Sequence, residues 1–125
     1  MKNLELQERP IPSSLSPEQK IVVRTKTVSH VLSIKDITHL VCDCYLTTVY
    51  TKTGEHLMVA KLLKEFEQEL EGCGFVRVNR NTMINVVHVT SFATGRKRTV
   101  QLSNSTSFVM SRRGMGRLKE HIEVK

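Results

Sequence analysis

The stretch FVRVNRNTMINVVHVT, residues 75–90, decides the fold that this sequence predicts. In its first part, apolar and polar side chains alternate with the period of two that is typical of a β-strand, which puts Val76 and Val78 on one face. We expect these two valines to face the core. Arg80 ends the alternation, and a buried arginine would be unfavourable there. The sequence therefore predicts an exposed corner at Arg80 and Asn81, between this strand and the next.

Runs of similar character lie on both sides of this stretch. They are rich in Val, Ile, Thr and Tyr and are separated by residues that favour turns, such as Thr53-Gly54, Thr94-Gly95 and Asn104-Ser105. The runs are IVVRT (21–25), VSHVLSI (28–34), ITHLVCD (37–43), TTVYTK (47–52), EHLMVA (55–60), FVRVNR (75–80), TMINVVHVTSFA (82–93), KRTVQL (97–102) and SFVMS (107–111). They predict a mostly β fold, an elongated antiparallel sheet or sandwich of about nine or ten strands.

The segment KLLKEFEQELEGCG, residues 61–74, has helical periodicity instead. Glutamates occupy one face and Gly72 provides a stop, so we expect one amphipathic helix of about three turns that covers the sheet. Its apolar face is predicted to hold Leu62, Leu63, Phe66 and Leu70. A short carboxyl-terminal helix is expected over residues 117–122. The predicted core of the second half of the chain consists of Val76, Val78, Ile84, Val86, Val100, Leu102 and Val109.

The chain of 125 residues suits one domain with a single core. Residues 1–19 contain all three prolines and several serines and are expected to form a flexible leader, which leaves residues 20–125 for the domain. No apolar run is long enough to span a membrane, and the amino terminus does not resemble a secretory signal. The three cysteines favour reduced thiols over a disulfide framework. We therefore expect a cytoplasmic protein with no membrane partner.

The positive charge of the chain is unevenly distributed. Residues 1–71 carry nine Lys/Arg and ten Asp/Glu, a net charge of −1, whereas residues 72–125 carry ten Lys/Arg and two Asp/Glu, a net charge of +8. A positive field of this kind attracts phosphate. Two basic clusters, Arg96-Lys97-Arg98 and Arg112-Arg113, fall at strand boundaries, where a β scaffold presents binding groups. Ser111 is expected to cap a following helix, to let the backbone N–H groups at the start of that helix bind a phosphate, or to do both.

Metal binding and catalysis have little support in the sequence. Cys42 and Cys44 fall on one side of a strand, but together with Cys73 they lack the spacing of a four-ligand zinc site. The five histidines form no compact ligand motif, and neither glycine-rich motif for nucleotide phosphates is present. We expect no enzyme activity, no metal and no cofactor.

Several of these segments together resemble the LytTR family of bacterial DNA-binding domains. The resemblance lies in FVRVNRNTMINVVHVTSF, VQLSNSTSFVMSRR and an LKEHI-like end, and in DITHLVCDCYLTTVYTKTGEHLMVAKLLKEFEQEL, which is similar to the family's strand, tyrosine-bearing loop, hairpin and helix. It implies an elongated all-β domain that regulates transcription. Such a domain binds duplex DNA through loops in successive major grooves, usually at paired repeats, where two copies could associate as a homodimer.

Carried over position by position, the resemblance implies a structural role for Asn85 and DNA contacts in three segments. The basic cluster 96–98, identified from its charge, is added to these three segments. The predicted DNA-binding residues are then Tyr45, Leu46, Asn79, Arg80, Asn81, Arg96, Lys97, Arg98, Arg112 and Arg113. Arginine suits the edge of guanine and asparagine that of adenine, although a corner that only touches phosphates is the alternative at Arg80 and Asn81. The chain departs from the family pattern at Asn79, where the family has His, and at Asn81, where Ser is common.

Two other functions would share the charge and the β content. A single-stranded nucleic-acid or RNA-binding β module stacks bases on aromatic side chains, and this chain has no Trp, four Phe and two Tyr. A protein-interaction domain with a basic face for an acidic partner is left open by the charge alone. The resemblance favours duplex DNA over both.

Overall fold

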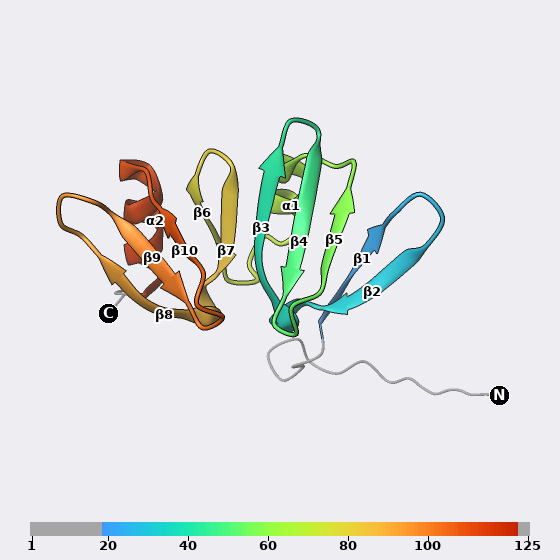
Figure 1. Ribbon diagram of the computed structural model, residues 1–125, viewed down its shortest axis with the longest axis horizontal. Helices are drawn as coiled ribbons and strands as arrows, with labels where there is room; N and C mark the ends of the chain where they lie inside the picture. Colours follow the sequence, from blue (N-terminus) through green and yellow to red (C-terminus); the bar gives the residue numbers. More distant parts are fainter. Residues whose placement is uncertain (1–18, 123–125) are drawn as a thin grey trace.

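The computed structural model describes residues 19–122, so most of the expected leader lies outside the described residues. Within them, ten strands and two α-helices form three antiparallel sheets that lie side by side along the long axis of the molecule (Figure 1). A β1-β2 hairpin stands at one end, a sheet in the order β5-β4-β3-β7-β6 occupies the middle, and a sheet in the order β10-β9-β8 stands at the other end. The predicted elongated, mostly β architecture is confirmed.

The strands are β1 (Lys20–Arg24), β2 (Ser29–Ser33), β3 (Ile37–Asp43), β4 (Leu46–Thr51), β5 (His56–Val59), β6 (Phe75–Asn79), β7 (Thr82–Asn85), β8 (Val89–Ala93), β9 (Thr99–Leu102) and β10 (Ser107–Val109). The helices are α1 (Leu63–Glu69) and α2 (Arg112–Ile122), and two 3₁₀ turns are η3 (Ile34–Asp36) and η4 (Val86–His88). The hairpin predicted around Thr53-Gly54 is confirmed by the pairing of β4 with β5. Residues 82–93 are two strands rather than one, because η4 interrupts them and the Asn85 side chain accepts the Val87 N–H at 3.3 Å.

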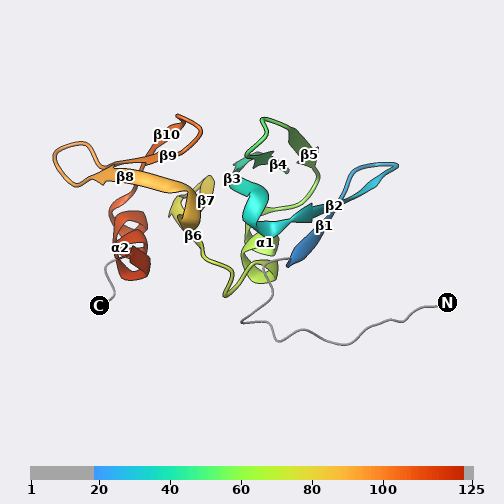
Figure 2. The same cartoon turned by 90° about the horizontal axis from the view of Figure 1, so that it is seen from below.

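Helix α1 covers one face of the middle sheet (Figure 2). Leu63, Phe66 and Leu70 are buried there against the inner residues of β1, β3, β4 and β5, as the helical spacing predicts. The expectation for Leu62 was wrong: it precedes the helix in an extended conformation and is 46% exposed. The helix is also about two turns long rather than three, because the chain leaves helical geometry at Leu70.

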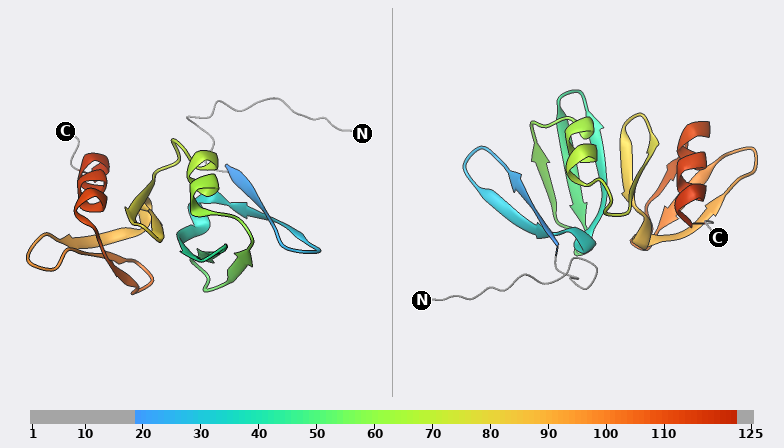
Figure 3. Two further views of the ribbon diagram at one scale, coloured as in Figure 1. Left: turned by 90° about the horizontal axis from the view of Figure 1, so that it is seen from above. Right: turned by 180° about the vertical axis from the view of Figure 1, so that it is seen from behind.

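Helix α2 packs beside β6 and, like α1, lies on the same face of the molecule (Figure 3). It begins at Arg112 rather than Arg117, so the expected helix was too short. The Ser111 hydroxyl caps it by accepting the Gly114 N–H at 2.9 Å. A Cβ atom on Gly114 would overlap the backbone carbonyl of Val78, so this glycine allows the helix to contact the strand directly.

The buried apolar residues form two cores rather than the single core expected. The first core is the one closed by α1, and the second lies between β6, β7, the β10-β9-β8 sheet and α2. Val76, Val78, Ile84, Val100 and Leu102 are buried in it, as predicted, and Val86 is half-buried at its margin. The prediction for Val109 was wrong, since its side chain is 53% exposed. Phe108 pairs with the buried Val100 and faces the core, so alternation along β10 turns Val109 outward and Met110 inward.

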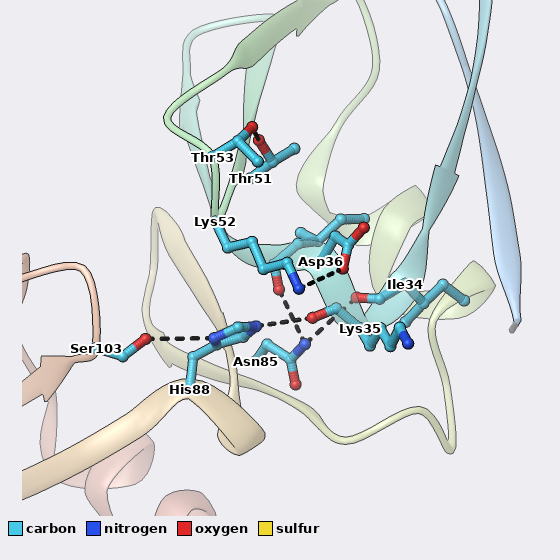
Figure 4. Close-up of polar contacts among 10 residues, drawn as sticks. Ile34, Lys35, Asp36, Thr51, Lys52, Thr53, Asn85, His88 and Ser103 are labelled. Atoms are coloured by element: carbon cyan, nitrogen blue, oxygen red, sulfur yellow. Dashed lines mark hydrogen bonds and ion pairs between the residues drawn. The ribbon is translucent and has the colours of Figure 1, made fainter. Parts of the chain in front are cut away.

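Polar contacts join η3, η4 and the residue after β9 at the junction of the middle sheet and the last sheet (Figure 4). The Asn85 side-chain amide donates to the Ile37 carbonyl at 2.9 Å, in agreement with the structural role implied for it. His88 Nε2 donates to the Lys35 carbonyl at 2.8 Å, and His88 Nδ1 lies 3.4 Å from the Ser103 hydroxyl. Two 3₁₀ turns far apart in the sequence are therefore held together by side chains.

His39 occupies a second contact between these sheets. Its ring stacks on Tyr50 of β4, with centroids 4.3 Å apart, and meets Phe108 of β10 at 4.9 Å. Its Nδ1 lies 2.9 Å from the Thr38 hydroxyl, and the residue is only 3% exposed. Burial lowers the pKa of His39 from 6.5 to about 4. The imidazole is therefore neutral at neutral pH.

This burial predicts that acid destabilises the fold. Between pH 6.5 and 4 the unfolded chain binds a proton at His39 that the folded chain does not, so the free energy of unfolding falls as the pH falls through this window. We expect unfolding at pH 5 to require about 2 kcal/mol less than at pH 7 from this residue alone. Urea unfolding measures the difference. His39→Phe, which keeps an aromatic ring, should remove this difference between pH 5 and pH 7, whereas replacement of an exposed histidine in His121→Gln should not. An unchanged pH dependence in His39→Phe would contradict the assignment of the difference to His39.

The approach of α2 to β6 predicts opposite effects at two neighbouring glycines. Gly114→Ala should destabilise the fold by about 1 to 3 kcal/mol or more, because the methyl group meets backbone that cannot move aside cheaply. Gly116→Ala is the matched control, since nothing lies within 4 Å of a Cβ there and alanine favours helix by about 1 kcal/mol. Chemical denaturation compares the two. Equal stability of the two variants would show that α2 does not pack so closely.

Candidate nucleic-acid interface

The segments that contain the predicted DNA-binding residues project from one edge of the molecule (Figure 1). We call this the loop edge and define it by four segments: the β3–β4 turn (44–45), the β6–β7 turn (80–81), the β8–β9 loop (94–98) and the start of α2 (112–113). In antiparallel pairs, every second connection falls at the same edge, which explains the common direction of the strand connections. All ten predicted site residues lie in these segments or directly beside them.

The β3–β4 turn presents an aromatic side chain to solvent. Cys44 adopts a left-handed conformation with φ of 60°, so the turn needs only two residues. Tyr45 is 79% exposed and Leu46 is 42% exposed. Asp43 precedes them at the end of β3 and is also exposed.

The β6–β7 turn has a fixed backbone and free side chains. Asn79 holds it from within, because its Oδ1 accepts the Asn81 N–H and its Nδ2 donates to the Val109 carbonyl, both at 2.8 Å. The Cys42 N–H donates to the Asn81 carbonyl at 2.8 Å. The side chains of Arg80 and Asn81 are exposed, which confirms the predicted corner. Asn79 thus uses both polar groups of its side chain within the protein.

Arg77 supports the same turn from the outer face of β6. Its guanidinium donates to the Arg80 carbonyl at 2.8 Å and forms an ion pair with Glu67 of α1 at 3.1 Å. From the sequence, the period of two places Arg77 on the face of the strand opposite Val76 and Val78, and it indicates no partner for the side chain. Its role was missed because its partners come from a helix and a turn that alternation along a strand does not reveal.

The start of α2 is attached to the same strand. The Ser111 N–H donates to the Val78 carbonyl at 2.9 Å, and Arg117 donates to the Arg77 carbonyl at 3.0 Å. Arg112 and Arg113 are exposed at the first turn of the helix. The helix start, the β6–β7 turn and the β3–β4 turn are therefore joined by hydrogen bonds into one unit.

The β8–β9 loop stands at one end of the loop edge. Arg96 and Lys97 are exposed, whereas Arg98 is half-buried and donates from Nε to the Met110 carbonyl at 3.3 Å. The Met110 N–H in turn donates to the Arg98 carbonyl at 2.8 Å. Arg98 therefore anchors this loop next to the start of α2, and two of the three basic side chains remain free to bind.

The described residues contain no group of three or more His, Cys, Asp and Glu side chains that could hold a metal ion. Cys42, Cys44 and Cys73 are free thiols. Over residues 19–122, no helix is long and apolar enough to cross a membrane. The loop edge is thus a surface of arginine, lysine, asparagine and tyrosine side chains on a rigid backbone, suited to phosphates and base edges.

Comparison with known proteins agrees with this geometry. The family described as the LytTr DNA-binding domain matches residues 27–123. The chain belongs to the LytTR family. A solved structure from Bacillus cereus, described as the LytTr DNA-binding domain of a methyl-accepting/DNA response regulator, superposes on this LytTR domain with a TM-score of 0.69 at 17% sequence identity. The match covers 82% of this chain and 95% of that chain and establishes a shared fold. No curated protein matches the chain significantly.

The contacts of Asn79 predict that this LytTR domain loses the shape of its corner when they are removed. Asn79→Ala should cost about 1 to 3 kcal/mol of stability and expose the Asn81 amide to faster hydrogen exchange. Asn79→Asp is the matched control, because a carboxylate still accepts the Asn81 N–H but cannot donate to Val109. Exchange measured by NMR should therefore be fast at Asn81 in the first variant and slow in the second. Slow exchange in both contradicts the bracing role.

Proposed function

We propose that this LytTR domain is a sequence-specific double-stranded-DNA-binding transcription regulator that reads the duplex with its loop edge. The observation that carries the proposal is that backbone and side-chain hydrogen bonds connect β6 and the β6–β7 turn to α2, to β10 and to the end of β3 that precedes the β3–β4 turn. A binding surface that is already ordered loses little conformational entropy when it meets the DNA. The strands act as a scaffold, and the turns supply the contacts.

The residues divide by the chemistry of their side chains. Arg80, Asn81 and Arg113 would contact base edges, because their planar groups form paired hydrogen bonds with guanine or adenine in the major groove. Tyr45 and Leu46 would add apolar contact, for example with the methyl group of thymine. Arg96, Lys97 and Arg112 would bind phosphates and set the position of the protein. Asn79 and Arg98, which are bonded within the protein, would act by holding their segments in place.

The surface supports duplex binding better than single-strand binding. Modules that bind single strands need several exposed aromatic rings on which bases stack. Among the described residues Tyr45 is the exposed aromatic residue, whereas Phe66 is buried and the other rings are half-buried. Turns that extend along one edge suit successive major grooves on one side of a duplex. We infer that the partner is duplex DNA in the cytoplasm, that two copies bind paired repeats, and that no catalytic step is involved.

Selection of bound sites from a random duplex library tests the proposal directly. An enriched motif with two half-sites is expected, and the absence of any motif would contradict base reading. Arg80→Ala or Arg113→Ala should weaken binding to the selected site by about 1 to 3 kcal/mol and relax the preference at particular base pairs. Lys97→Ala should weaken all duplexes about equally. If all three variants lose affinity equally on selected and unrelated duplexes, the loop edge binds phosphates only.

A further inference from the structure

A fifth connecting segment points in the same direction as the loop edge: the turn of the β1–β2 hairpin (Figure 1). Residues 20–35, which form the hairpin and the beginning of η3, contain no Asp or Glu and four basic residues, Lys20, Arg24, Lys26 and Lys35. The net charge of −1 over residues 1–71 conceals this group, because the ten acidic residues of that half all lie outside residues 20–35, four of them in and around α1. The hairpin is thus a basic element in a half of the chain that is nearly neutral.

The hairpin holds its turn rigidly. The Thr25 N–H donates to the Val28 carbonyl at 2.8 Å, and the Thr25 hydroxyl donates to the same oxygen at 3.1 Å. Its base is fixed because Ile21 and Val23 are buried in the first core. Arg24 and Lys26 are exposed at the turn. Glu65 and Glu69 line a groove of about 570 Å³ between β1 and α1. Arg24 also lines this groove, whereas Lys26 does not.

We propose that Arg24 and Lys26 form a further phosphate-binding site, which holds the DNA backbone flanking the bases that the loop edge reads. The inference rests on the proposed function, since it requires a duplex along the loop edge. The hairpin and the β8–β9 loop stand at opposite ends of the molecule, so together they would grip the backbone on both flanks (Figure 1). The family match begins at residue 27, and both residues therefore lie outside the matched part of the chain.

A duplex suits this turn better than other anionic partners. Ammonium, guanidinium and threonine hydroxyl groups are the usual contacts of phosphate oxygens, and the turn offers all three through Lys26, Arg24 and Thr27. Its common direction with the loop edge places it beside any linear polyanion bound there. Because no exposed aromatic residue accompanies it, the turn offers a single strand nothing on which bases could stack.

The test compares the salt dependence of duplex binding by the full chain and two double variants. Each lost phosphate contact makes the slope of log K against log salt shallower by about 0.9, so Arg24→Ala with Lys26→Ala should reduce the slope by about 1 to 2. Lys52→Ala with Lys64→Ala removes the same charge from exposed positions away from the loop edge and should leave the slope unchanged. Hydroxyl-radical footprinting should show protection at one flank of the site that disappears only in the first variant.

The outcomes separate this inference from the proposed function. Equal slopes and footprints for the unmodified chain and the Arg24/Lys26 variant would overturn the inference and leave the proposed function standing. The same would follow if both double variants lost slope equally, which is the result of a net-charge effect. Loss of binding to single strands but not to duplex would also overturn it. A chain that binds no duplex at all would overturn the proposed function, and the flanking site with it.

Discussion

The backbone of strand β6 and of the turn after it is hydrogen-bonded to two other parts of the chain, α2 and β3. The Val78 carbonyl accepts from Ser111 at the start of α2, and the Arg77 carbonyl accepts from the side chain of Arg117 within that helix. Beyond the strand, the Asn81 carbonyl accepts from Cys42. Buried peptide groups need partners, and here the partners belong to the segments that project from the loop edge. The relative position of these segments therefore depends on β6, and the absence of a Cβ at Gly114 permits this approach.

This arrangement separates stability from recognition. The side chains that fix the backbone, such as Asn79 and Arg77, direct their polar groups at carbonyls and amides within the protein. The side chains beside them, Arg80 and Asn81, are exposed and make no contribution to the core. Under the proposed function, substitution at the exposed positions would change base preference without loss of the fold. The side chains of Arg80 and Asn81 would then be the part of the surface that can change while the scaffold stays the same.

Local patterns in the sequence predicted much of this structure. Alternation placed Val76 and Val78 in the core and Arg80 at an exposed corner, because the period of two depends only on strand geometry. Ser111 was named as a cap, as the structure confirms, but the expected helical range of 117–122 was too short. Gly114 and Gly116 disfavour a helix locally, whereas the requirement for Gly114 comes from Val78, far away in the sequence. Val109 was assigned inward by its apolar character alone, although pairing of Phe108 with Val100 decides which face of β10 is buried. The contacts of Arg77 with Glu67 and of Asn79 with Val109 join distant segments, and no local pattern encodes them.

The central claim is that one edge of the scaffold meets the duplex while the helical face does not. NMR titration of the labelled protein with a selected duplex tests it residue by residue. We expect that the amide signals that shift most belong to the β3–β4 turn, the β6–β7 turn and the start of α2, and that the exposed residues of α1, such as Lys64 and Gln68, stay unchanged. Large shifts along α1 with an unchanged loop edge would contradict it.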